Sequence, residues 1–337
     1  MNYTTKTIGW TITLACVLSL CTGCQQPAQS SYSWHQRHDS IALLSSGRIV
    51  WQLNYKKQEG KPYFHPLCLI DGTELTRLRP PDHLWHRALW FSWKYINGLN
   101  YWDPEYPDGQ TEIINIKTEP RGDYSARIEM TLDYHPANKP AVLTEKRTLA
   151  VNAPDKNGCY YIDWLSIFTA GENDVLLDRT PIPGQKGAKP YGGYAGLSVR
   201  MAENTKHWRF LSSEGVLEPE ALGNKARWVD FSGPIADGKF AGITIFDHPD
   251  NLRHPSAWWL SASMPYFNPA VLFHEPYMLP AGKGLKLRYR ILVHTGIIDN
   301  NMLERQWQEF ALCHCEQRCD EAISTVRMVE IASLRSQ

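Results

Sequence analysis

Three long stretches of the sequence alternate apolar and polar side chains, and this pattern most constrains the fold. They are RIVWQLNY (48–55), RIEMTLDY (127–134) and LKLRYRILVH (285–294). A period of two is typical of a strand with one buried face. Further strands are predicted at 142–151, 159–169, 196–201, 208–212 and 240–246, with turn-forming pairs such as Asn97-Gly98 between them. The pattern predicts an all-β chain, most simply a large β-sandwich of two antiparallel sheets.

One segment near the C-terminus has a helical period instead. In NNMLERQWQEFAL (300–312), the apolar residues fall on one face behind an Asx cap. The sequence shows no internal repeat, so we expect one β-sandwich domain over residues 45–311 and a tail over 312–337. The long loop at 181–196, PIPGQKGAKPYGGYAG, is a candidate functional loop because compact domains rarely carry structureless loops of that length.

The N-terminus predicts export. Residues 1–23 combine a basic start with an apolar run, as in a signal peptide, and Thr22-Gly23-Cys24 resembles a bacterial lipobox. We expect a lipid on Cys24, a tether over 24–44, and an outer-membrane lipoprotein facing the periplasm or the cell surface. An ordinary signal peptide cut nearby is the alternative. After Cys24 no apolar run approaches the roughly 18 residues that span a bilayer, so we expect the lipid alone to anchor the protein to the membrane.

Charge and cysteine content limit the classes of binding partner that the sequence favours. Lys plus Arg equals Asp plus Glu at 35 each, which does not favour nucleic acid as a partner. Beyond the signal and Cys24, five cysteines remain, an odd number. Those of CHCEQRC, Cys313, Cys315 and Cys319, predict a disulfide or a disordered tail rather than a zinc site, and their pairing is open. The 13 Trp and 16 Tyr can fill a core or stack on sugar rings.

Histidines occur in several loop-like contexts. His83 and His86 lie in PPDHLWHRALWFSW, and the others follow in FDHP (His248), RHPS (His254) and FHEP (His274). Histidine is the natural acid, base or metal ligand near neutral pH. The neighbouring prolines predict rigid loops rather than strand interiors, and functional residues concentrate in such loops. We therefore expect these five histidines to lie on one concave face.

Four blocks carry a resemblance to a known family. They are PPDHLWHRALWFSWKYINGLNYWD, KPYGGYAGLSVR, IFDHPDNLRHPSAWW and YFNPAVLFHEPYMLPAGKGLKLRYRILVHTG, in this order within residues 45–311. The chain resembles the PmoA-like family of secreted bacterial proteins, whose label borrows the name of a methane monooxygenase subunit. The resemblance implies a galactose-mutarotase-like β-sandwich and a role in polysaccharide or sugar catabolism. It does not imply oxygenase activity, because the monooxygenase subunit spans the membrane many times, whereas this sequence has no membrane-spanning run after Cys24.

Three functions compete for these residues. In the first, histidines and a carboxylate act on carbohydrate by acid–base catalysis, as an epimerase, lyase or glycoside hydrolase. In the second, a divalent metal polarises the substrate. In the third, the protein binds glycan without catalysis. The predicted catalytic residues are His83, His86, Glu145, His248, His254 and His274. The predicted substrate-binding residues are Arg87, Asn97, Trp102, Tyr191, Arg253 and Glu275. Asp82 and Glu275 are further candidates for the carboxylate, and the arginines suit the carboxylate of an acidic sugar.

Overall fold

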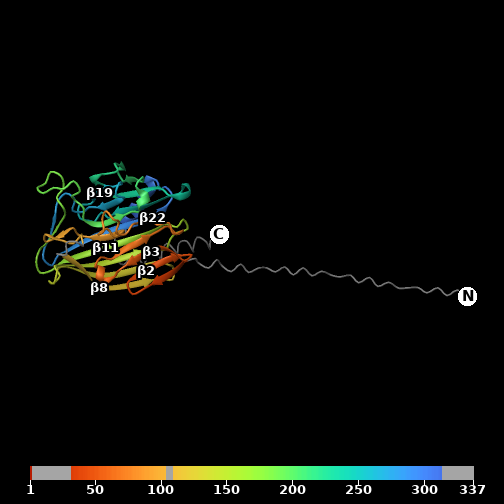
Figure 1. The fold of residues 1–337 in the computed structure, drawn as a ribbon, viewed down its shortest axis with the longest axis horizontal. Coiled ribbons are helices and arrows are strands. Elements are labelled where there is room, and N and C mark those ends of the chain that lie inside the picture. Colours follow the sequence, from red (N-terminus) through yellow and green to blue (C-terminus); the bar gives the residue numbers. More distant parts are fainter. Residues whose placement is uncertain (2–31, 104–108, 313–337) are drawn as a thin grey trace. The chain divides into compact units, whose positions relative to one another are not determined.

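Antiparallel strands build three sheets in the computed structural model, which describes Met1 and residues 32–103 and 109–312 (Figure 1). Within these residues, the first sheet has nine strands in the order β1 (Tyr32–Gln36), β2 (Ser40–Ser45), β3 (Arg48–Asn54), β4 (Tyr63–Leu67), β5 (Leu89–Ser92), β13 (Gly196–Arg200), β20 (Tyr266–Pro269), β19 (Ala257–Ser261) and β16 (Leu222–Lys225).

The second sheet also has nine strands in the described part of the chain. Their order is β15 (Gly215–Leu217), β14 (Arg209–Ser212), β17 (Trp228–Pro234), β18 (Phe240–Asp247), β22 (Gly284–Thr295), β11 (Tyr160–Ala170), β10 (Leu143–Val151), β9 (Ala126–Pro136) and β8 (Gly109–Pro120). A small sheet pairs β21 (Tyr277–Leu279), β12 (Val175–Asp178), β6 (Tyr95–Ile96) and β7 (Leu99–Asn100). Single 3-10 turns occur at η1 (Lys57–Glu59), η2 (Glu203–Thr205) and η3 (Ala236–Gly238).

The main core lies between the two large sheets, because alternate side chains of each point into it. Leu89 and Phe91 of β5 join this core from the first sheet, and Ile162 and Trp164 of β11 join it from the second. The intervening side chain of β5, Trp90, points to the opposite face of the first sheet and joins a separate aromatic cluster. The predicted all-β sandwich is confirmed, and this outer face of the first sheet carries the site described below.

The long alternating stretches form strands as predicted, at β3, β9 and β22, and the predicted helix is α1 (Asn300–Leu312). The tether predicted for residues 24–44 is wrong over its second half, where β1 and β2 form a hairpin on the edge of the first sheet. Ile41 and Leu43 of β2 are fully buried in the main core. Burial of these apolar side chains stabilises a strand where a solvated linker was expected.

The helix α1 packs on the outer face of the second sheet. Leu303 and Phe310 of α1 are buried with Trp228, Phe246 and Leu292, which come from β17, β18 and β22. An amphipathic helix is stabilised by burying its apolar stripe in this way. The helix therefore lies on the sheet that does not carry the site.

Several predictions concern residues that the structure does not describe. The signal peptide (1–23), the lipid on Cys24 and the cysteines of the tail lie outside the described residues, so export and lipid anchoring stay predictions. Among the described residues, Cys68 and Cys159 are free thiols. The described part of the chain contains no helix that is long and apolar enough to cross a membrane.

Candidate functional site

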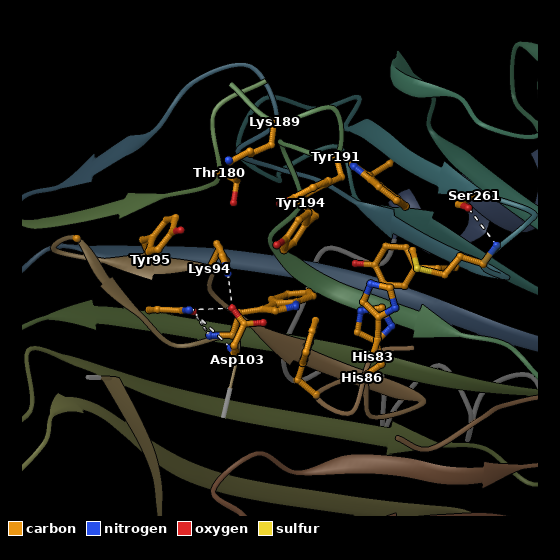
Figure 2. Close-up of a pocket in the computed structure, with 17 residues that line it drawn as sticks. His83, His86, Lys94, Tyr95, Asp103, Thr180, Lys189, Tyr191, Tyr194 and Ser261 are labelled. Atoms are coloured by element: carbon orange, nitrogen blue, oxygen red, sulfur yellow. Dashed lines mark hydrogen bonds and ion pairs between the residues drawn. The ribbon is translucent and has the colours of Figure 1, made fainter. Parts of the chain in front are cut away.

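A cavity of about 840 Å³ opens on the outer face of the first sheet (Figure 2). Four segments that are far apart in the sequence line it: the loop before β5, the segment from Lys94 to Asp103 that contains β6 and β7, the loop between β12 and β13, and the strands β19 and β20. The volume falls in the range of roughly 300 to 1,000 Å³ that is typical of pockets for small ligands.

The loop before β5 brings His83 and His86 to one end of the cavity. Two turn hydrogen bonds shape this loop, from the amide of His83 to the carbonyl of Pro80 (2.9 Å) and from the amide of His86 to the carbonyl of His83 (3.0 Å). The two imidazole rings consequently stack, with centroids 4.6 Å apart and planes at 25°. On a regular strand, two side chains three positions apart would point to opposite faces. The irregular entry after Pro80-Pro81 makes them converge.

His83 is held by an aspartate that is itself held by an arginine. Asp82 Oδ2 lies 2.9 Å from His83 Nδ1 and accepts a hydrogen bond from Arg200 Nη2 at 2.7 Å. The hydrogen bonds from His83 and Arg200 outweigh partial burial and lower the pKa of Asp82 to about 2. Since an ionised carboxylate only accepts hydrogen bonds, His83 Nδ1 carries the proton. Nε2 is then the nitrogen that can take up or return a proton, as in a base oriented by a carboxylate.

His86 supports His83 from beneath in its neutral form. Its ring is 3 % exposed and lies between His83 and Tyr266, whose ring centroid is 5.1 Å away at an interplanar angle of 26°. Burial, followed by the positive electrostatic effect of His83 and Arg200, holds the pKa of His86 well below its usual range. A neutral His86 adds no like charge that would oppose protonation of His83.

Aromatic rings form most of the cavity wall. Trp259 of β19 and Tyr266 of β20 meet edge to face, with centroids 5.2 Å apart. Trp102 and Tyr194, from two other segments, have centroids 5.0 Å apart. The Tyr266 hydroxyl lies 2.9 Å from Ser198 Oγ of the neighbouring strand, which fixes the ring. Such rings present broad apolar faces, while the hydroxyl and indole groups at their edges remain polar.

A buried ion pair lies at the other end. Asp103 Oδ2 accepts hydrogen bonds from Lys94 Nζ at 2.5 Å and from Asn100 Nδ2 at 2.8 Å. Asn100 is fixed in turn, because its Oδ1 accepts the backbone amide of Trp102 at 2.9 Å. Figure 2 shows Lys94 and Asp103 at one side of the cavity, His83 and His86 at the other, and Tyr191 and Tyr194 between them. The cavity therefore has two polar ends and an aromatic middle.

Lys61 lies behind Trp102, and its Nζ donates a hydrogen bond to the Trp102 carbonyl at 2.8 Å. Burial, together with the nearby Arg87, lowers the pKa of Lys61 from 10.5 to about 7. Above pH 7 the folded chain loses this proton while the unfolded chain keeps it, so the free energy of unfolding should rise with pH. The expected slope is up to about 1.4 kcal/mol per pH unit.

The window for this measurement ends near pH 9, where the Cys68 thiol begins to titrate in the unfolded chain. Urea unfolding at several pH values between these limits measures the slope, and we expect Lys61→Met to remove it. Equal slopes for the original protein and the variant would show that another group is responsible.

Two predicted catalytic histidines, His248 and His254, contact the C-terminal helix α1 and do not line the cavity. His248 is fully buried, with its ring edge-on to Phe310 of α1 at 5.1 Å. His254 stacks on Trp307 of α1 at 6.0 Å and 6°, and its Nδ1 lies 2.8 Å from Asp247 Oδ2. Both follow β18 of the second sheet, so the prediction that they share one concave face with His83 is wrong. Their proline-flanked loops are rigid, but they dock a helix.

His274, Arg253 and Glu275 also lie outside the cavity lining. His274 is exposed, and its carbonyl accepts a hydrogen bond from Arg179 Nη2 at 2.9 Å. Arg253 forms an ion pair with Glu275 at 3.1 Å and donates a hydrogen bond to its carbonyl at 2.7 Å. His274, predicted as catalytic, and Arg253 and Glu275, predicted to bind the substrate, are therefore not brought together with His83 and His86 in the cavity lining. They hold loops together beside the site.

Glu145, Arg87 and Asn97 have structural partners. Glu145 is fully buried between the large sheets with Arg147 and does not line the cavity, so the structure places it away from the site where a catalytic role was predicted. Arg87 forms an ion pair with Glu59 at 2.8 Å, away from the cavity lining. Asn97 forms the predicted turn, and its Oδ1 accepts the amide of Leu176 from β12 at 2.8 Å. Neither Arg87 nor Asn97 lines the cavity, and each stabilises a neighbouring segment.

Of the predicted site residues, His83, His86, Trp102 and Tyr191 line the cavity. Sequence reasoning missed several others, which are Trp85, Lys94, Asn100, Asp103, Tyr194, Trp259 and Tyr266. Lys94, Asn100 and Asp103 stand in the stretch WKYINGLNYWD, directly after the two histidines. The sequence signal that could have identified them is a lysine and an aspartate, Lys94 and Asp103, on either side of the predicted Asn97-Gly98 turn. In the described part of the chain, no three His, Cys, Asp or Glu side chains gather as a metal site.

The chain belongs to a family described as a family of unknown function (DUF6807), whose model matches residues 40–308. No curated protein matches it. Among solved structures, it is similar to the galactosidase domain of the alpha-galactosidase–sucrose kinase AgaSK, at 9 % identity and a TM-score of 0.35, covering 79 % of this chain and 41 % of that one. It is also similar to a galactose mutarotase related enzyme from Lactobacillus acidophilus, at 7 % identity and a TM-score of 0.27, covering 78 % and 97 %. The chain spans about two fifths of the first structure's length.

Proposed function

We propose that the protein binds a carbohydrate in this cavity and transforms it by acid–base chemistry, with His83 as the group that transfers the proton. The observation that carries the proposal is the joint placement of an aspartate-oriented histidine and an aromatic wall in one cavity of about 840 Å³. The proposal retains the acid–base function that the sequence favours, with a different set of residues.

The lining supports carbohydrate as the ligand. A sugar ring has an apolar C–H face and a rim of hydroxyls, so it needs flat rings and a mixture of donors and acceptors. Trp259 and Trp102 contribute aromatic rings to the lining, while Ser261 and Thr180 contribute small polar side chains that are largely buried. Pockets for small molecules combine apolar walls with a few convergent polar groups in this manner.

The arrangement at His83 supports a reaction beyond binding. Asp82 fixes the proton on Nδ1, so Nε2 can accept a proton from a substrate hydroxyl or from a carbon next to a carbonyl, and return it later. Epimerisation, elimination and hydrolysis all require a group that performs this transfer. His254 is also paired with an aspartate, Asp247, but it packs on α1, whereas the pair of His83 and Asp82 places its imidazole in the lining of the cavity.

The direct test is incubation of the protein with a panel of oligosaccharides, together with their 3-keto and uronic derivatives, followed by product analysis. We expect at least one sugar to be converted at a rate proportional to protein concentration. Treatment with a chelator should leave the rate unchanged, because the described residues offer no metal site. Saturable binding without any product would instead establish a glycan-binding protein, and loss of the rate after chelation would support the metal-dependent alternative.

A further inference from the structure

We propose that Lys94, Asn100 and Asp103 form a subsite that recognises uncharged neighbouring hydroxyls, so that the substrate is a neutral oligosaccharide rather than an acidic one. This inference rests on the proposed function and names the substrate class for the same cavity. It differs from the expectation that arginines select a sugar carboxylate.

The volume of the cavity favours a ligand longer than one sugar. Figure 2 places His83 and His86 at one end of the cavity and Lys94 and Asp103 at the other, with Tyr194 between them. A cavity of about 840 Å³ is of the size that encloses a drug-sized ligand, which corresponds to about two or three sugar rings. A sugar that reacts at His83 would therefore extend a further unit to the ion pair.

The subsite has free hydrogen-bonding capacity of both kinds. A carboxylate has about four acceptor positions, and within the described part of the chain the side-chain hydrogen bonds to Asp103 occupy Oδ2 alone, from Lys94 and Asn100. An ammonium has three donors, and Lys94 uses one of them on Asp103. One hydroxyl can consequently donate to Asp103 while its neighbour accepts from Lys94.

An aromatic platform accompanies these polar groups. Lys94 Nζ lies 5.7 Å from the centroid of the Tyr194 ring, and Tyr194 packs on Trp102. Burial, followed by the negative charge of Asp103, raises the pKa of Tyr194, so its phenol stays neutral. A sugar ring held by its hydroxyls at Lys94 and Asp103 would thus lie against uncharged aromatic faces.

The charge balance disfavours an acidic sugar. The positive charge of Lys94 is already compensated by Asp103, and a second carboxylate brought to this pair would be repelled by the first. The nearby Lys61 is only partly charged near neutral pH, because burial and Arg87 lower its pKa to about 7. Among the lining residues, Lys189 is a further cation, but it is exposed at the rim.

The arginines that suggested an acidic sugar are paired elsewhere. Arg87 forms an ion pair with Glu59, and Arg253 forms one with Glu275. Neither of them lines the cavity. These arginines therefore give no reason to expect a uronic acid as the ligand. The charged groups that do line the cavity, Lys94 and Asp103, suit the hydroxyls of a neutral sugar.

The test uses calorimetric titration at neutral pH with a matched pair of ligands, trigalacturonate and its fully methyl-esterified form, beside cellotriose, maltotriose and mannotriose. The two galacturonate probes share stereochemistry and differ in charge. We expect a neutral trisaccharide to bind and the charged form to bind at least about tenfold more weakly than its ester, because the Asp103 carboxylate repels a second carboxylate.

Asp103→Asn, which keeps the shape of the side chain, should weaken binding of the neutral ligand about 10- to 100-fold and reduce the preference for the ester over the acid. Lys94→Gln should give a similar loss from the other member of the pair. Lys186→Met is the matched control, because Lys186 is an exposed lysine of the same loop that does not line the cavity, and the variant should preserve the affinity. Thermal unfolding of each variant verifies that it is folded.

Two results would overturn the subsite: preferential binding of trigalacturonate that Lys189→Met abolishes, or unchanged affinity of the neutral ligand in a folded Asp103→Asn variant. Both leave the proposed function intact, since a sugar still binds. Conversely, the expected binding pattern with no turnover of any bound sugar would overturn the proposed chemistry at His83 and support the subsite.

Discussion

Replacement of His83 by glutamine is expected to lower the turnover number of the sugar about 100- to 10,000-fold, the usual contribution of a positioned acid or base. The affinity should change little, because the hydroxyl contacts at Lys94 and Asp103 are at the other end of the cavity. Glutamine preserves much of the volume and a polar end, but it cannot exchange a proton near neutral pH. Single-turnover kinetics beside calorimetric titration separates these two effects.

His274→Gln provides a matched control for this experiment. His274 is exposed, does not line the cavity, and contacts the neighbouring loop through its backbone carbonyl. The variant should therefore retain the turnover number of the original protein, although the sequence alone grouped His274 with His83. Equal losses in the two variants would contradict the assignment of His83, as would a fully active His83→Gln protein.

Asp82 acts through His83 and is a positioning residue. In Asp82→Asn the carboxylate that accepts from Nδ1 is lost, so the proton is no longer confined to that nitrogen. The turnover number should fall about 100-fold while the ligand affinity stays unchanged, because Asp82 orients His83 and does not belong to the subsite at Lys94 and Asp103. A role of Asp82 in structure alone would lower the affinity and the thermal stability together with the turnover number.

The sheet architecture follows from the sequence because the signal is local. Alternation in β3, β9 and β22 reports one buried face along each strand, and such a pattern needs no knowledge of the partner strand. The order of strands does not follow from it. The strand β22 lies between β18 and β11, far from both in the sequence, and no local pattern specifies that pairing. The wrong prediction of a tether over residues 24–44 has the same cause. The strands β1 and β2 are short, and what identifies β2 as a strand is the burial of Ile41 and Leu43 in the folded protein.

The candidate site was predictable only in part, for the same reason. His83 and His254 look alike in the sequence, since each stands in a proline-containing loop beside aromatic residues. Their roles diverge because one loop enters the first sheet and the other follows a strand of the second sheet, under α1. Trp259 and Tyr266 were missed because a buried aromatic residue on a strand has the same pattern whether it faces the core or the cavity.

The largest effect on stability is expected from Glu145, which the sequence placed among the catalytic residues. Its carboxylate, 0 % exposed, accepts two hydrogen bonds from Arg147 and one each from Tyr134 and Ser166. Alternation along β10 does not say which face is inside, and here the charged pair faces the main core. Burial and the negative charge of Glu145 raise the pKa of Tyr134 well above its usual range, so the phenol keeps its proton and donates a hydrogen bond to the carboxylate.

Glu145→Leu should lower the free energy of unfolding by about 3 to 5 kcal/mol, because it leaves the Arg147 guanidinium buried without its counterion. The double variant Glu145→Leu/Arg147→Met should recover most of this loss, since removing both charges also removes their desolvation cost. Urea unfolding measures each value. Glu129→Leu, on the exposed side of β9, is the control and should change stability by about 1 kcal/mol or less.

The same variants separate structure from catalysis. If Glu145 only stabilises the core, the turnover number per folded molecule in the double variant should equal that of the original protein. A folded double variant with normal stability and lost turnover would return Glu145 to the catalytic residues. The ion pair lies between the large sheets and the cavity lies on the outer face of the first, so we expect the chemistry to be unaffected. The burial of Glu145 with Arg147 is thus a property of the fold on which the site is built.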